Sequence, residues 1–155
     1  MNSYEALIDK CYKDNVTVVE KRFKSKAKGL WKDYKIGINS RLLTIAEKHC
    51  ILAEEYGHFK TTCGDILDLN NICNLKQENR AKAYGFELVC SIKKIIKAIE
   101  NGALDRYEIA EFLEVTDEFF THAIEYHKHK NGSSVKHGDF IVSFEPTLRI
   151  FKMGE

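Results

Sequence analysis

The sequence predicts a single α+β domain over residues 1–155, mostly helical, with a small antiparallel sheet. Apolar residues recur at helical spacing through the middle of the chain, and short runs rich in β-branched and aromatic residues lie nearer its two ends. A composition of 44% hydrophobic and 30% charged residues is that of an ordinary globular domain. A chain of this length buries about 70% of its unfolded surface, so a core can form without a disulfide or a structural metal.

The N-terminal part of the chain predicts one helix followed by two strands. Residues 4–12 place apolar side chains at the i, i+3, i+4, i+7 spacing of a short amphipathic helix. Residues 16–23 and 30–38 are typical of strands. The stretch 21–28 between them is basic and contains no acid. We interpret it as a solvated hairpin loop rather than a nucleic-acid patch, because no aromatic platform accompanies it.

Two helices are expected in the middle of the chain. Thr44 and Glu47 have the spacing of a capping box, which predicts a helix that begins there and reaches at least Tyr56. Residues 60–74 contain Thr, Gly, Asp and Asn and are expected to be mostly loop. A long helix is predicted over residues 75–99, closed by the C-cap signal Asn101-Gly102.

The C-terminal part predicts two short helices and a hairpin. The helices occupy residues 105–128 with a break near 115–117, and the hairpin strands 140–144 and 148–151 turn around Pro146. The segment 105–125 resembles the start of a helix-turn-helix, but it holds one base and seven acids (Asp105, Glu108, Glu111, Glu114, Asp117, Glu118, Glu125). Such a surface repels DNA. We therefore interpret it as a packing unit or a protein-docking surface.

Charge and cysteine content exclude several classes of protein. The formal net charge is only +1, which argues against a general binder of phosphate backbones. The five cysteines are odd in number and scattered, without a C-x-x-C pair, which is typical of reduced thiols rather than of a disulfide framework or a cysteine-rich zinc site. No run of eighteen apolar residues and no signal-peptide pattern occurs, so we expect a cytoplasmic protein that binds no membrane.

A candidate for chemistry lies at the end of the apolar run 50–58. Glu54 and His58 are four residues apart, so on a helix they share one face and can hold one ion, with Glu55 beside them. This is the spacing of His-Glu-x-x-His, in which two histidines bind zinc and the glutamate activates water, although Glu54 stands at the first histidine position. The alternative is an exposed i, i+4 pair that binds no metal.

A third ligand is expected from the next helix, because catalytic zinc takes three protein ligands and one open position. The small residues Ala81 and Gly85 would let the two helices approach closely enough to bring Glu78 to the ion. In the alternative, the small residues are merely core and Glu78 pairs with Lys82 on the surface.

Five short motifs that follow one another along the chain together resemble one protein family. They are Gly29-Leu30, residues 35–39 (KIGIN), 47–58 (EKHCILAEEYGH), 61–67 (TTCGDIL) and 76–81 (KQENRA). Together they resemble the ImmA/IrrE metallopeptidases, in the form found in phages and mobile elements of Gram-positive bacteria. The similarity extends over nearly the whole chain.

The resemblance implies a small zincin-like metallo-endopeptidase domain. In that domain Glu55 would be the general base, and the metal ligands would be Glu54, His58 and Glu78. Zn²⁺ is the expected metal, and Mn²⁺ or Fe²⁺ are alternatives, because a carboxylate in place of an imidazole makes the site rich in oxygen.

The resemblance also implies a protein substrate, a phage or mobile-element repressor of the helix-turn-helix type, cleaved to relieve repression. No direct contact with nucleic acid is expected. The strand that ends at Asn39 is expected beside the cleft, with an edge that binds an extended peptide. The alternative is a catalytically inactive regulatory module of the same fold that binds a repressor without cutting it, which the departure at Glu54 favours.

Overall fold

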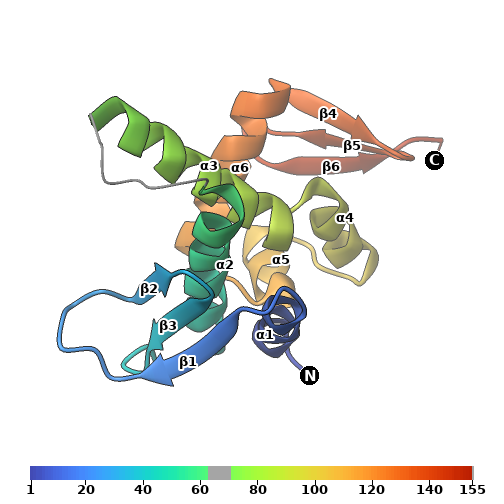
Figure 1. Cartoon of the computed structure of the whole chain (residues 1–155). Coiled ribbons are helices and arrows are strands. Elements are labelled where there is room, and N and C mark those ends of the chain that lie inside the picture. Colours follow the sequence, from blue (N-terminus) through green and yellow to red (C-terminus); the bar gives the residue numbers. More distant parts are fainter. Residues whose placement is uncertain (63–70, 155) are drawn as a thin grey trace. The chain divides into compact units, whose positions relative to one another are not determined.

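The computed structural model describes residues 1–62 and 71–154, with the side chains of 1–62 and 75–154. The described residues confirm a mixed α+β architecture (Figure 1). Contacts divide the chain into two compact units, Met1–Leu88 and Val89–Glu155. No helix among the described residues is long and apolar enough to cross a membrane.

The N-terminal unit begins with helix α1, Ser3–Lys13. Asn2 caps it, because its side chain accepts from the backbone N–H of Glu5 while the Glu5 carboxylate accepts from the backbone N–H of Asn2. The buried side chains Tyr4, Leu7 and Cys11 recur every three or four residues and form the inner face of the helix. The predicted amphipathic helix is thus confirmed.

A three-stranded sheet follows, formed by β1 (Thr17–Lys21), β2 (Gly29–Lys32) and β3 (Lys35–Asn39) in the order β1-β3-β2. β3 pairs parallel to β1 and antiparallel to β2. The sheet is therefore mixed, and the prediction of an antiparallel sheet is wrong here.

The predicted strand 30–38 is in fact the hairpin of β2 and β3. It turns at Asp33, whose φ of 53° is left-handed, a conformation that Asp tolerates better than most residues. The basic stretch 21–28 is consequently not a hairpin loop. It connects β1 to β2, which lie at opposite edges of the sheet with β3 between them.

Helix α2, Ile45–Thr61, packs against this sheet and against α1. Thr44 and Glu47 form the predicted capping box. Leu52, Ala53 and Tyr56 have no exposed surface and anchor the helix in the core. Helix α3, Asn71–Val89, begins within the region predicted to be mostly loop, of which residues 63–70 lie outside the described residues.

The predicted helix 75–99 is interrupted. α3 ends at Val89, and α4, Ile92–Glu100, begins after Ser91, whose hydroxyl accepts from the backbone N–H of Lys94. A serine N-cap satisfies a donor that a continuous helix would have paired with a carbonyl, so the chain can change direction there. The predicted end is confirmed, with Asn101 at the C-cap and Gly102 at a φ of 102°.

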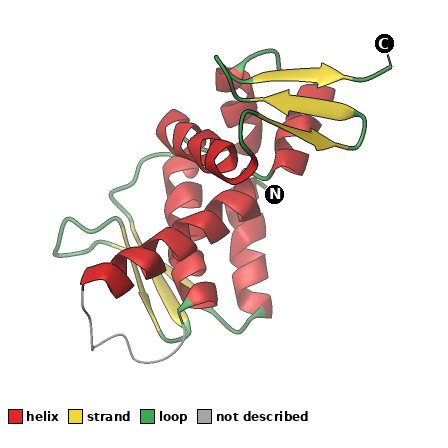
Figure 2. Cartoon of the chain, turned by 90° about the horizontal axis from the view of Figure 1, so that it is seen from above, coloured by secondary structure: helices red, strands yellow, loops and turns green. Residues whose placement is uncertain are grey.

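The C-terminal unit continues with α5 (Arg106–Leu113), α6 (Asp117–Asn131) and a second sheet. Its strands β4 (Ser134–His137), β5 (Phe140–Ser143) and β6 (Arg149–Lys152) are antiparallel and lie side by side in sequence order (Figure 2). Both predicted helices and the predicted terminal hairpin are confirmed, whereas β4 was not predicted. Ile96, Val142 and Phe144 form the buried cluster of this unit.

Candidate metal centre

The three predicted ligands meet in the N-terminal unit. Glu54 and His58 lie one turn apart on α2, and Glu78 reaches them from α3. One ligand atom from each of the three lies within 4.8 Å of the others. His58 Nε2 is 3.4 Å from Glu78 Oε2, so Glu78 interacts across the helix pair. The alternative prediction, a surface pair of Glu54 and His58 alone, does not account for the position of Glu78 beside them.

Close packing of α2 on α3 brings Glu78 within reach. A Cβ on Gly57 would lie 2.2 Å from the Ala81 carbonyl oxygen, and a Cβ on Gly85 would lie 3.3 Å from that of Ala53. Ala81 itself has no exposed surface. The predicted contribution of Ala81 and Gly85 to a close approach is confirmed, and Gly57, which was not assigned this role, makes the tightest contact.

The spacing of the donors fits a small divalent cation. Zinc ligands about 2.1 Å from the metal at tetrahedral angles lie about 3.4 Å from one another, which is the separation of the His58 and Glu78 donors. The whole group spans at most 4.8 Å, so a contraction of about 1 Å would complete the site. Two carboxylates and one imidazole suit Zn²⁺, Mn²⁺ or Fe²⁺.

The carboxyl groups repel one another. Burial, together with the negative charges of Glu54 and Glu78, raises the pKa of Glu55 from 4.5 to about 7, and burial is the largest of these causes. Burial also raises the pKa of Glu54, against the opposing effect of Lys82 and with the help of Glu78. Three acids held together against their own repulsion form a site that a cation would stabilise.

Strand β2 lies directly over Glu55. A Cβ on Gly29 would lie 2.5 Å from Ile51 Cγ2 and 2.9 Å from Glu55 Cγ, so a side chain here would displace both residues. Gly29 thus allows the strand to approach the helix at the residue predicted to be the general base. This contact explains why Glu55 is largely shielded from water although it lies near the end of α2.

Trp31 was missed by the sequence reasoning. Its ring stacks on the imidazole of His58, with centroids 6.4 Å apart and planes 10° from parallel. The indole N–H donates to the Asp33 carbonyl at 2.9 Å, which fixes the ring. The available signal was its position two residues after Gly29, on the same face of a strand expected beside the helix.

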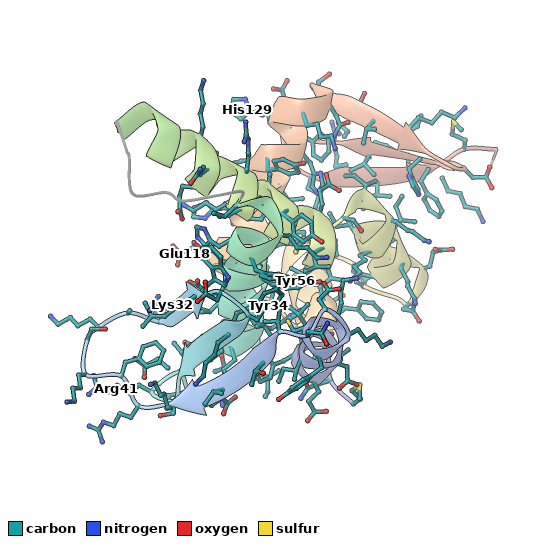
Figure 3. The ribbon with its side chains drawn as sticks, viewed as in Figure 1. Lys32, Tyr34, Arg41, Tyr56, Glu118 and His129 are labelled. Atoms are coloured by element: carbon teal, nitrogen blue, oxygen red, sulfur yellow. The ribbon has the colours of Figure 1, made fainter. Side chains whose placement is uncertain are left out.

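A second set of contacts fixes α2 from its other side. The Tyr56 hydroxyl donates to Asp14, at the end of α1, and Lys60 Nζ lies 2.8 Å from the same carboxylate. Hydrogen bonds from Lys60 and Tyr56 hold the pKa of Asp14 below its usual value. Tyr56 is labelled in Figure 3. These contacts lock the register of the helix that carries Glu54, Glu55 and His58.

Comparisons of the chain with protein-family models, with curated proteins and with solved structures find no match. The resemblance to the ImmA/IrrE metallopeptidases therefore stays a prediction that depends on the motifs of the sequence.

Proposed function

We propose that the protein is a metal-dependent endopeptidase of the zincin-like type, in which Glu54, His58 and Glu78 hold the metal and Glu55 is the general base. The proposal depends above all on one observation, the convergence of three ligand atoms from two helices beside a third, partly buried carboxyl group, that of Glu55. A divalent cation bound there would supply a Lewis acid that polarises the carbonyl of the scissile peptide bond.

The role of Glu55 follows from its surroundings. A general base in peptide hydrolysis takes a proton from the attacking water and then gives one to the leaving amine. Burial under β2 raises the Glu55 pKa toward neutrality, which favours a group that must both accept and donate a proton near pH 7. A bound cation would lower this pKa again, and the shielding by Gly29 and Ile51 would remain.

The substrate would bind along β2. The strand that ends at Asn39 is β3, which lies at the centre of the sheet, so the prediction that it offers an edge is wrong. Among the described residues, β2 pairs with β3 alone. The Lys28 carbonyl accepts from the Asn39 N–H and so points toward β3. Because the backbone N–H and C=O groups of every second residue point to the same side of a strand, those of Gly29 and Trp31 point away from β3. An extended peptide can pair with those groups and pass beside Glu55.

A helix-turn-helix repressor is the substrate that the family resemblance implies, and it is part of this proposal. A non-catalytic repressor-binding module is the second candidate. It is favoured by Glu54 at the position of a histidine, and by the burial of this carboxyl, which raises its pKa and so weakens the repulsion among the carboxyl groups when no cation is bound. The two candidates share the binding edge and differ in the role of Glu55.

The test compares wild-type protein with Glu55→Gln on peptide substrates, each supplied in turn with Zn²⁺, Mn²⁺ and Fe²⁺. Removing a general base lowers the rate about 10²- to 10⁴-fold, while metal content should be unchanged because Glu55 is not a ligand. Equal cleavage by both proteins would refute the assigned role. Metal binding without cleavage by wild type under any of the three metals would favour the binding module.

A further inference from the structure

The N-terminal sheet bears a surface of concentrated positive charge. Between residues 21 and 46 the chain has one acid, Asp33, and eight bases, all exposed: Lys21, Arg22, Lys24, Lys26, Lys28, Lys32, Lys35 and Arg41. We call these eight residues the basic surface. With eight positive charges against one negative, the segment carries +7, whereas the whole chain carries +1. The near-neutral total therefore conceals a strongly basic region.

The loop between β1 and β2, which supplies four of the eight bases, is fixed on the sheet. Phe23, only 5% exposed, packs on the side of β3 where Gly37 leaves room, since a Cβ on Gly37 would lie 3.2 Å from its ring. The end of β3 then ties down the loop backbone. Asn39 Nδ2 donates to the Ala27 carbonyl at 2.9 Å, and the Ser40 N–H donates to the Lys21 carbonyl at 3.0 Å. The basic surface is therefore a defined surface rather than a solvated tail.

Two residues of the basic surface, Lys28 and Lys32, lie on the opposite face of β2 from the metal centre. Gly29 and Trp31 face α2, where they contact Glu55 and His58. Successive strand residues alternate between faces, so Leu30 and Lys32 lie on the other face, in line with Lys28. Leu30 is 54% exposed, and Lys32 is exposed too (Figure 3). Every second residue along this face therefore presents a side chain in the order basic, apolar, basic: Lys28, Leu30 and Lys32.

A peptide paired with the edge of β2 that no described strand covers would show two different faces to the protein. Its alternate side chains would lie about 5 Å from Lys28, Leu30 and Lys32, within the range of cross-strand pairs. The remaining side chains would lie on the face of Gly29 and Trp31, toward α2 and the carboxyl group of Glu55, where an acid meets no cross-strand base. Acidic residues are thus favoured on one face of the peptide and not on the other.

We propose that β2 and the basic surface select an extended peptide of the pattern acid-x-apolar-x-acid, with the acids beside Lys28 and Lys32 and the apolar residue beside Leu30. This inference depends on the proposed function for the use of the β2 edge, and it names the substrate class. A nucleic acid would use the charge but not the strand-pairing backbone groups, and the Trp31 ring is already stacked on His58. The observations therefore favour a peptide.

The experiment measures binding of dye-labelled peptides to the full chain by fluorescence anisotropy, at low and at raised salt. Peptides containing Glu-Ala-Leu-Ala-Glu, Gln-Ala-Leu-Ala-Gln and Ala-Glu-Leu-Glu-Ala are compared in the same neutral flanks. Two cross-strand charge pairs predict roughly tenfold tighter binding of the first peptide than of the second. The third has the composition of the first but places its acids on the opposite face from Leu, so it should bind more weakly than the first.

Two double variants complete the test. Lys28→Gln with Lys32→Gln should abolish the preference for the acidic peptide, whereas Lys93→Gln with Lys97→Gln removes the same charge from exposed positions on α4 and should preserve it. Equal binding of acidic and amide peptides, or a preference that survives the first double variant, would overturn the proposal. Tighter binding of a single-stranded oligonucleotide through Lys28 and Lys32 would overturn it in favour of a nucleic acid.

Failure of the proposed function has a different signature. A peptide bound with the predicted charge preference but cut under no metal would refute the hydrolase and support the inference. Cleavage of the acidic and amide peptides at equal rates would support the hydrolase and refute the inference.

Discussion

Replacing Gly57 by Ala should separate α2 from α3 and disrupt the metal centre. The added Cβ would lie 2.2 Å from the Ala81 carbonyl oxygen, whereas ordinary contacts begin near 3.4 Å. The obstructing atom is backbone rather than the end of a flexible side chain, so α3 must move by about 1 Å or more. The only other response open to the chain is distortion of α2 itself.

The size of the effect follows from two opposing contributions. Gly→Ala within a helix stabilises by about 1 kcal/mol, and overpacking of a well-filled contact costs about 1–3 kcal/mol. Because this overlap is severe, we expect the upper end of that cost and a net loss of about 2 kcal/mol in the free energy of unfolding. Gly85→Ala is the matched control, because its Cβ would lie 3.3 Å from the Ala53 carbonyl oxygen and requires a shift of only tenths of an ångström.

Urea denaturation of both variants measures the loss, and competition with a chromogenic chelator measures their metal affinity. Displacement of α3 by about 1 Å moves Glu78 from His58, so we expect Gly57→Ala to lose at least tenfold in affinity and Gly85→Ala to stay within about twofold of wild type. Equal stability and equal metal affinity for the two variants would refute the close packing of α2 on α3 as the cause of the site.

Three further predictions concern the helix that carries the site. The metal-free protein should lose about 3 kcal/mol of stability as the pH rises from about 4.5 to about 7, because the folded state keeps Glu55 protonated with a pKa near 7 after the unfolded chain has ionised; thermal denaturation across this range should show the loss, and Glu55→Gln should remove the part due to Glu55 and leave the contribution of Glu54. Trp31→Ala should weaken metal binding roughly three- to tenfold by freeing the His58 ring, and Trp31→Phe should restore most of it; equal affinity of the Ala and Phe variants would exclude a positioning role for the ring. Thr44→Ala should cost about 1 kcal/mol in urea denaturation through loss of the N-cap, with unchanged metal affinity because the cap lies more than two turns from Glu54; a drop in affinity would show that the two ends of α2 are coupled.

Local signals were enough for most helix ends. The capping box of Thr44 and Glu47 and the C-cap at Asn101 involve residues within one turn, so sequence spacing reveals them. The break after Val89 was missed, because apolar residues continue through it and neither Pro nor Gly marks it. Ser91 was the available signal, but a serine within a helical pattern is too common to end a helix by itself.

Strand pairing, unlike the helix ends, could not be predicted from local sequence signals. Whether β1 pairs with β2 or with β3 depends on contacts between residues far apart in the chain, and a hairpin is the default for adjacent strands. The short turn at Asp33 carries no Gly or Asn-Gly signal, so β2 and β3 were interpreted as one strand. Because of this error, neither the edge of β2 that no described strand covers nor the fixed position of the basic loop was predicted.

More of the candidate site than of the strand pairing could be predicted from the sequence. Glu54, Glu55 and His58 follow from helical spacing, and Glu78 followed from the small residues that permit a close approach of the second helix. Gly29 and Trp31 could not be assigned, since their contacts depend on which face of β2 meets α2. Alternation gives two sets of strand side chains and does not say which set lies against the helix.

Elemental analysis shows whether Glu54, His58 and Glu78 hold a metal ion. Protein purified without a polyhistidine tag or a chelator would be measured beside Glu78→Ala, with circular dichroism to confirm that the variant folds. We expect near-stoichiometric zinc, manganese or iron in the wild type and its loss in the folded variant, because the two remaining ligands on α2 do not hold a catalytic metal. A wild-type protein that contains no metal and takes up none when Zn²⁺, Mn²⁺ or Fe²⁺ is added would contradict the metal centre and the hydrolase with it.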